Sequence, residues 1–157
     1  MGVSLSSNEK GEQKQQELAE EDNNGMMFIR AISDWNKGDL ESYLLMYAPS
    51  VIIHGIPGVE AGIESAKKFY RGFHRAFPDT QILVEDLFTR ADKLACRFTV
   101  SGTHKAEFMG ISATDKFIKF TGITILKFIA GKCTERWNQA DFLGMLQQLG
   151  AIPEKIS

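Results

Sequence analysis

The sequence is poor in the residues that build metal centres and disulfide frameworks. It has two cysteines, Cys96 and Cys133, and three histidines, at positions 54, 74 and 104. Zinc and non-haem iron sites use more closely paired ligands, so a metal site is not expected. In a chain without an export signal, the two cysteines are expected to be reduced and packed rather than joined in a disulfide.

Other absences bear on where the protein acts and on what it binds. The N-terminal residues MGVSLSSNEKGEQ lack the apolar core of a signal peptide, and no apolar run approaches the length of a membrane span. The formal net charge is -2 and the pI is about 5.9, which gives no basic surface for nucleic acid. A cytoplasmic protein that binds neither membranes nor nucleic acid is therefore the expectation.

The length and the charge distribution predict one folded domain behind an acidic tail. A chain of 157 residues, 43% of them hydrophobic, is long enough for one core and too short for two ordinary domains. Residues 1–24 carry six acidic and two basic side chains and have little to bury. We predict a flexible acidic N-terminal tail over residues 1–24, of which residues 13–21 could extend the first helix, and a single domain over residues 25–157.

Hydrophobic periodicity predicts mainly helices in the first half of the domain and mainly strands in the second. The predicted helices cover residues 28–35, 40–47, 63–77 and 142–149, and the predicted strands cover residues 50–54, 81–90, 93–103, 116–129 and 133–139. Two connections between strands, Ala91-Asp92 and Ala130-Gly131, are short enough for hairpins. This order is typical of an α+β domain with helices on one face of a curved antiparallel sheet.

Asp141 stands where the last predicted strand passes into the last helix. Residues 133–139 alternate with the two-residue period of a strand, and Phe142 begins an apolar helical stripe. Aspartate is a preferred N-cap residue, so Asp141 can be a plain helix cap. It can also be a carboxylate delivered to the mouth of a pocket behind the sheet, where it would act as an acid or a base. The residues leave both interpretations open.

The strand around Arg97 has one apolar face and one polar face. If the helices cover the polar face, Arg97 is a partly buried cation that needs a carboxylate, for which Glu135 is the candidate. If that face meets water, Arg97 is solvated. Leu94, Phe98 and Val100 are candidates for an apolar patch on the outer face of the sheet, and such a patch predicts a homodimer or a higher homo-oligomer.

A set of short motifs occurs in order along the chain. They are Trp35-Asn36-x-Gly38-Asp39-Leu40, Tyr47-x-Pro49, His54-Gly55, Ala76-Phe77-Pro78-Asp79, Gly102-Thr103-His104, Phe108-x-Gly110-Ile111 and Glu135-x-Trp137-x-x-x-Asp141. From about Met26 to Pro153 this set resembles the SnoaL-like polyketide cyclases, or predicted ester cyclases, of the nuclear transport factor 2-like superfamily. The resemblance implies a cone-shaped α+β barrel, in which a strongly curved antiparallel sheet has helices packed on its concave face around an apolar pocket.

The resemblance also implies a chemistry. In the characterised cyclases, an aspartate at the position of Asp141 is the general acid/base of an intramolecular aldol closure, with no metal or cofactor. The forming enolate needs a donor, which His54, His104 or Arg97 could supply. We therefore expect an apolar small-molecule substrate and the catalytic residues Asp141, His104 and His54. The expected substrate-binding residues are Arg97, Trp137, Glu135, Gln139, Trp35, Phe108 and Tyr47.

Other functions stay open beside the cyclase. Ketosteroid isomerase-like and epoxide hydrolase-like enzymes of the same superfamily would use the same pocket for different substrates. A non-catalytic small-molecule-binding or dimerisation domain would use Asp141 only as a helix cap. The chain also departs from the family pattern, because Lys105-Ala106 and Asp115 stand where glycine is common, which predicts differently shaped loops beside the pocket.

Overall fold

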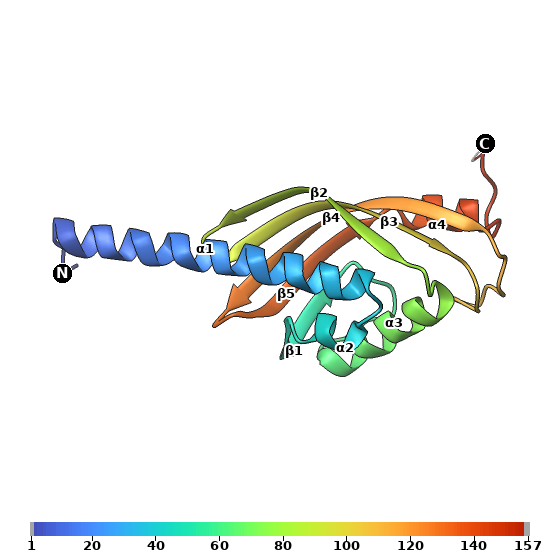
Figure 1. The fold of residues 1–157 in the computed structure, drawn as a ribbon, viewed down its shortest axis with the longest axis horizontal. Helices are drawn as coiled ribbons and strands as arrows, with labels where there is room; N and C mark the ends of the chain where they lie inside the picture. The colour runs from blue at the N-terminus through green and yellow to red at the C-terminus, as the bar shows by residue number, and fades with distance from the viewer. Residues whose placement is uncertain (1, 156–157) are drawn as a thin grey trace.

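The computed structural model describes residues 2–155 as an α+β fold, with helices and strands in the predicted order. The helices are α1 (Ser7–Asn36), α2 (Leu40–Leu44), α3 (Ile63–Ala76) and α4 (Phe142–Gln148), and the strands are β1 (Tyr47–His54), β2 (Gln81–Arg90), β3 (Lys93–Thr103), β4 (Phe117–Ile129) and β5 (Lys132–Ala140). Figure 1 shows α1, α2 and α3 together on one side of the sheet, with α4 at the end of β5.

The five strands form one curved sheet in the order β1-β5-β4-β3-β2. Strands β2 to β5 pair antiparallel, and both predicted hairpin turns are present, with Ala91 and Ala130 at positive φ. Strand β1 pairs in parallel with β5 at the other end of the sheet. The sheet is therefore mixed rather than purely antiparallel, and its edge strands β1 and β2 do not meet, so the expected barrel is open.

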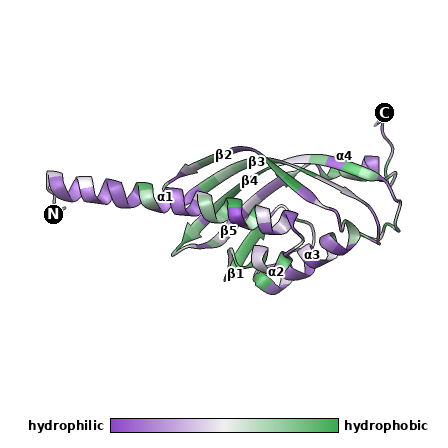
Figure 2. Cartoon of the chain, viewed as in Figure 1, coloured by the Kyte–Doolittle hydropathy of each residue, from purple (hydrophilic) through white to green (hydrophobic). Residues whose placement is uncertain are grey.

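Helix α1 begins much earlier than the sequence pattern predicted. A capping box starts it, in which the Ser6 hydroxyl accepts from the Glu9 N–H at 3.2 Å and the Ser6 N–H donates to Glu9 Oε2 at 2.6 Å. Residues 7–24, predicted to be a flexible tail, are thus helical in the structure. Their side chains are mostly exposed, and the part of α1 that extends past the sheet in Figure 2 is mainly hydrophilic.

The apolar face of β3 packs against the helices. Leu94, Phe98 and Val100 are all buried, so the prediction that they form an outer patch is wrong. The polar face meets solvent, where Arg97 Nε donates to Asp86 Oδ2 at 2.6 Å. The alternation of residues separated the two faces of β3 correctly, but it did not say which face the helices cover. The apolar face is the covered one, because burying it removes more apolar surface from water.

The motif that begins at Trp35 has a clear structural role. The Asn36 amide donates to the Ile82 carbonyl at 2.9 Å and accepts from the Ile82 N–H at 2.7 Å, which fixes the end of α1 against β2. Gly38 has a φ of 82°, in the region that favours glycine, and allows the chain to turn into α2. The Asp39 side chain then caps α2 by accepting from the Ser42 N–H. This connection holds Trp35 and Tyr43 side by side in the core.

Candidate functional site

A hollow with a cavity volume of about 60 Å³ lies between the concave face of the sheet and the helices. Most of its wall is apolar or aromatic. The lining residues are Trp35, Tyr43, Ile56, Phe69, Tyr70, Phe73, Ile82, Phe98, Val100, Phe120, Arg136, Asn138, Ala140 and Phe142. An apolar cleft with a small number of polar side chains is the usual form of a small-molecule site.

Strand β5 supplies the charged part of this wall. Arg136 and Asn138 lie on its inner face and are buried, whereas Trp137 between them points outward. Because β5 pairs with β1 on one side and β4 on the other, its backbone is held along both edges. The two polar side chains are therefore presented by a central strand, which positions them more rigidly than a loop would.

The Arg136 guanidinium is surrounded by neutral oxygen atoms. Its Nη1 lies 2.6 Å from the hydroxyl oxygen of Tyr47, 3.0 Å from that of Tyr70 and 3.1 Å from that of Tyr43. Its Nε donates to Thr124 Oγ1 at 2.8 Å, and its Nη2 donates to Asn138 Oδ1 at 3.3 Å. We call Arg136 with the three tyrosines the arginine–tyrosine cluster. Within residues 2–155, no carboxylate pairs with this buried cation.

The protonation states of the cluster follow from its burial. Burial raises the pKa of Tyr47 and of Tyr70 well above the usual value, and the Arg136 charge only partly opposes this rise. Burial alone would lower the pKa of Arg136, but the tyrosine oxygens, Tyr47 first, raise it above the usual arginine value. The Tyr47 and Tyr70 phenols therefore stay neutral and the guanidinium stays charged, which leaves one positive charge beside the hollow without a carboxylate partner among residues 2–155.

Trp35 and Tyr47, two of the predicted binding residues, belong to this region. Trp35 is buried, borders the hollow and packs edge-on against Tyr43 and Tyr70, at centroid distances of 5.0 and 5.7 Å. Its indole N–H has no acceptor among the described residues. Tyr47 lies behind the wall, where its hydroxyl bridges those of Tyr43 and Tyr70 at 2.9 and 3.1 Å.

Asp141, the predicted acid/base, is the N-cap of α4. Its Oδ1 accepts from the Gly144 N–H at 2.8 Å, and the side chain is exposed. Its neighbours Ala140 and Phe142 both line the hollow, whereas Asp141 itself is not among the lining residues. The carboxylate is thus outside the lining of the hollow, between two residues that line it, and is already bonded to its own helix.

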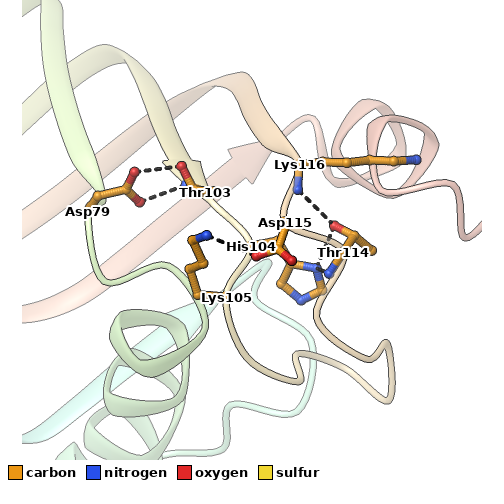
Figure 3. Close-up of polar contacts among 7 residues, drawn as sticks. All are labelled: Asp79, Thr103, His104, Lys105, Thr114, Asp115 and Lys116. Carbon is orange, nitrogen blue, oxygen red and sulfur yellow. Dashed lines mark hydrogen bonds and ion pairs between the residues drawn. The ribbon is translucent and has the colours of Figure 1, made fainter.

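His104 and Phe108, also predicted as site residues, lie to one side of the hollow. His104 is fully buried, and its ring stacks on that of Phe77. Thr114 contacts the His104 Nδ1 through both its hydroxyl and its backbone N–H (Figure 3). Because Nδ1 accepts the Thr114 N–H, the neutral ring carries its proton on Nε2, which has no partner in the described chain. Phe108 is buried against Phe69, Phe73 and Phe77.

The remaining predicted residues lie on the outer face of the sheet. His54 Nε2 contacts Glu135 Oε1 at 2.9 Å, and the His54 ring stacks on Trp137 at a centroid distance of 5.6 Å. Gln139 is exposed on the same face of β5. Arg97 pairs with Asp86, so the expected contact between Arg97 and Glu135 is not formed. The sheet therefore separates this group from the hollow.

The predicted residues did not include most of the polar wall, namely Arg136, Asn138, Tyr43 and Tyr70. A signal for the first two was present, because the alternation in β5 that drew attention to Glu135, Trp137 and Gln139 assigns Arg136 and Asn138 to the opposite face. For the tyrosines the signal was weaker, since each sits in an apolar pattern typical of plain core.

The structure also bears on the expectations for metal ligands, cysteines and membrane spans. Across residues 2–155, no three His, Cys, Asp or Glu side chains gather as metal ligands. Cys96 and Cys133 are both free and buried, as expected. None of the helices in the described chain is long and apolar enough to cross a membrane.

Comparisons with known proteins assign the fold to a family. AclR from Streptomyces galilaeus, a proposed hydroxylase, is 27% identical, with 85% of this chain and 99% of that chain covered and a TM-score of 0.77. IdmH from Streptomyces antibioticus, a proposed polyketide cyclase, is 29% identical, with coverages of 81% and 98% and a TM-score of 0.69. A proposed polyketide cyclase from Bacillus cereus ATCC 10987 is 32% identical, with coverages of 77% and 76% and a TM-score of 0.64. No curated protein sequence matches this chain. Because the SnoaL-like polyketide cyclase model matches residues 27–149, the chain belongs to the SnoaL-like polyketide cyclase family.

Proposed function

We propose that this protein binds an apolar small molecule in the hollow and catalyses proton transfer next to a carbonyl group of that molecule, in the manner of a polyketide cyclase. One observation carries the proposal: the polar side chains of an otherwise apolar wall all offer hydrogen-bond donors, among them the Asn138 amide, to whose Oδ1 the buried Arg136 donates. Such a wall suits an oxygen atom that gains negative charge during a reaction. The reaction needs no metal or cofactor.

The proposed step is a base-catalysed enolisation followed by ring closure. A base removes the proton from the carbon next to the carbonyl, and the C–H electron pair moves into an enolate whose oxygen takes the charge. The enolate carbon then attacks a second carbonyl of the same molecule, and the resulting alkoxide takes a proton back. Asn138 is suited to hold the enolate oxygen, because Arg136 already donates to its Oδ1 and so polarises the amide.

Asp141 is the proposed base. It follows the last inward-facing residue of β5, and its two neighbours line the hollow, so a substrate edge that emerges between Ala140 and Phe142 would meet its carboxylate. The carboxylate would have to release the Gly144 N–H, or use its second oxygen, to take a proton. His54 and His104 stay predicted as catalytic residues but lie outside the lining of the hollow.

A hydrogen-exchange assay tests the role of Asp141. In D₂O, the loss of the α-proton NMR signal of 2-acetylnaphthalene measures proton abstraction without requiring ring closure. We expect wild-type protein to accelerate the loss and Asp141→Asn to abolish the acceleration, because asparagine caps a helix about as well but cannot act as a base. Asp39→Asn is the matched control, since Asp39 caps α2 in the same way, and it should exchange like wild type.

The second candidate is a binding domain without catalysis. The engaged, exposed Asp141 favours it, because a carboxylate that caps its own helix already has a structural role. In that case Asp141→Asn is silent in every assay, while Asp141→Ala lowers the free energy of unfolding by about 1 kcal/mol. If wild type and Asp141→Asn exchange the α-proton at equal rates, the binding domain becomes the better supported function. Isomerase-like and epoxide hydrolase-like activities, and a cytoplasmic location, stay predictions.

We also propose that the protein forms a homodimer through the outer face of the sheet. Large apolar side chains are exposed there at Phe88, Ile123, Ile125 and Trp137. The strand register places Ile125 opposite Trp137, and Ile123 lies two residues away on the same face of β4, whereas Phe88 on β2 is separated from Ile125 by Ala95. Sedimentation velocity at micromolar concentration should show a dimer in wild type and a monomer in Ile125→Lys. A monomeric wild type would refute this proposal.

A further inference from the structure

The polar wall of the hollow has spare donors. The Arg136 guanidinium has five N–H groups, of which Nε uses one and Nη1 two, because three tyrosine oxygens share the two Nη1 hydrogens. Nη2 donates one hydrogen to Asn138 and has no acceptor for the other in the described chain. The Asn138 amide N–H groups have no acceptor within residues 2–155. The Trp35 indole N–H also lacks one there, and its ring packs edge-on against the His74 ring at a centroid distance of 4.0 Å.

The tyrosines add one more donor. Three phenol protons serve two contacts between phenols, Tyr43 with Tyr47 and Tyr47 with Tyr70, so one proton has no phenol acceptor. If the two bonds point the same way along the chain of hydroxyls, the free O–H belongs to Tyr43 or to Tyr70. Both of these line the hollow, whereas Tyr47 does not.

The charge of Arg136, like the spare donors, indicates a ligand that carries acceptor oxygens. A buried guanidinium is normally paired with a carboxylate, because taking it out of water costs several kcal/mol. Here its contacts are hydroxyls and one amide oxygen, and no carboxylate from residues 2–155 lines the hollow. The site therefore lacks one negative charge and the acceptor oxygens to receive its donors.

We propose that the molecule bound in the hollow carries a carboxylate on a flat, apolar skeleton, with the carboxylate at the arginine–tyrosine cluster. One carboxylate oxygen accepts the free Nη2–H of Arg136, and the other accepts the free tyrosine O–H. The aromatic wall, which includes Phe73, Phe98 and Phe120, encloses the skeleton. This inference rests on the proposed small-molecule function and adds to it that Arg136 anchors the substrate while Asn138 faces the reacting carbonyl.

Arg136 thus binds the carboxylate of the substrate and takes no direct part in the enolate chemistry. A neutral ketone or ester offers acceptor atoms but no charge, so it leaves the guanidinium uncompensated. A carboxylate supplies both and forms a charge-assisted pair with the planar guanidinium. The hollow should therefore discriminate between an acid and its neutral amide of nearly the same shape.

Calorimetric titration with 2-naphthoate and 2-naphthamide at neutral pH tests whether the hollow discriminates between an acid and its amide. Wild type should bind the acid about tenfold or more tightly than the amide, which corresponds to one charge-assisted hydrogen bond. Arg136→Met should lose the preference. Arg97→Met removes an equally positive but exposed side chain on the outer face, and it should keep the preference. Tyr70→Phe should weaken naphthoate binding several-fold and serves if Arg136→Met fails to fold.

Each contrary result overturns the proposal. These results are equal affinity for acid and amide in wild type, no binding of either compound at millimolar concentration, and a preference that persists in Arg136→Met or that disappears in Arg97→Met. The titration involves no turnover, so it is independent of the Asp141 exchange assay. If Asp141-dependent exchange holds while the acid preference fails, only the substrate class is wrong.

Discussion

Replacing Arg136 by methionine should change the stability of the ligand-free protein by no more than about 2 kcal/mol, although it removes a buried charge. The variant loses five polar contacts, each of which contributes at least about 1.5 kcal/mol when one partner is charged. Against this stand a desolvation cost of several kcal/mol, which disappears, and about 2 kcal/mol from burying a methionine. The free energy lost with the five contacts and the free energy regained from desolvation and methionine burial are therefore of similar size.

This expectation is specific because no carboxylate in the described part of the chain pairs with Arg136. Breaking a buried ion pair costs about 3–5 kcal/mol because a charge is left without its partner. Arg136→Met leaves no charge behind, and the hydroxyls of Tyr43, Tyr47 and Tyr70 still bond to one another. Tyr47→Phe is the opposite case, because it removes the contact at 2.6 Å while the guanidinium stays, and it should cost about 3 kcal/mol.

A double-mutant cycle measured by urea unfolding tests this account of the cluster. In the Arg136→Met background, Tyr47→Phe should cost only about 1 kcal/mol, which gives a coupling energy of about 2 kcal/mol. All four proteins are compared at one protein concentration, because dimerisation would shift the midpoint, and unchanged m-values establish that the same surface unfolds. Additive effects, or a loss above about 4 kcal/mol in Arg136→Met alone, would refute the reasoning.

Two further predictions concern Gly55 and His74. A Cβ on Gly55 would overlap the Asn138 carbonyl oxygen, whereas one on Gly58, at a similar φ, meets nothing within 4 Å. Gly58→Ala should therefore cost about 1–2 kcal/mol and Gly55→Ala at least about 4 kcal/mol in urea unfolding, and equal costs would contradict the contact. Burial lowers the pKa of His74 below its ordinary value of 6.5, so the unfolded chain takes up the proton first as the pH falls. The stability that depends on neutral His74 is complete above pH 6.5 and is lost as the pH falls towards the folded-state pKa. His74→Gln should reduce the stability difference between about pH 7.5 and about pH 5.5, and an unchanged difference would exclude His74 as its source.

The element order was predictable because hydrophobic periodicity and turn residues are local signals. Strands β2 and β3 match their predicted ranges, and both short hairpins occur where Ala91-Asp92 and Ala130-Gly131 indicated them. The early start of α1 was harder to predict, since the capping box around Ser6 lies far from any apolar stripe. Helix propensity and a good cap are sufficient to continue α1 there without a core to pack against.

The site was less predictable because it depends on which face of each strand the helices cover. Alternation in β5 distinguishes Glu135, Trp137 and Gln139 from Arg136 and Asn138, but it does not say which set is inside. A buried arginine also contradicts the ordinary expectation that charges lie outside. Only the three tyrosines, from α2, β1 and α3, explain why Arg136 is inside, and their meeting is a property of the tertiary fold.

The most direct test of the central claim is a crystal structure of the protein with bound 2-naphthoate. We predict the naphthalene ring among the aromatic side chains of the hollow and the carboxylate within hydrogen-bond distance of Arg136 Nη2 and of the Tyr43 or Tyr70 hydroxyl. Naphthoate bound in the hollow with its carboxylate directed away from Arg136, or bound only on the outer face beside Trp137, would contradict the account.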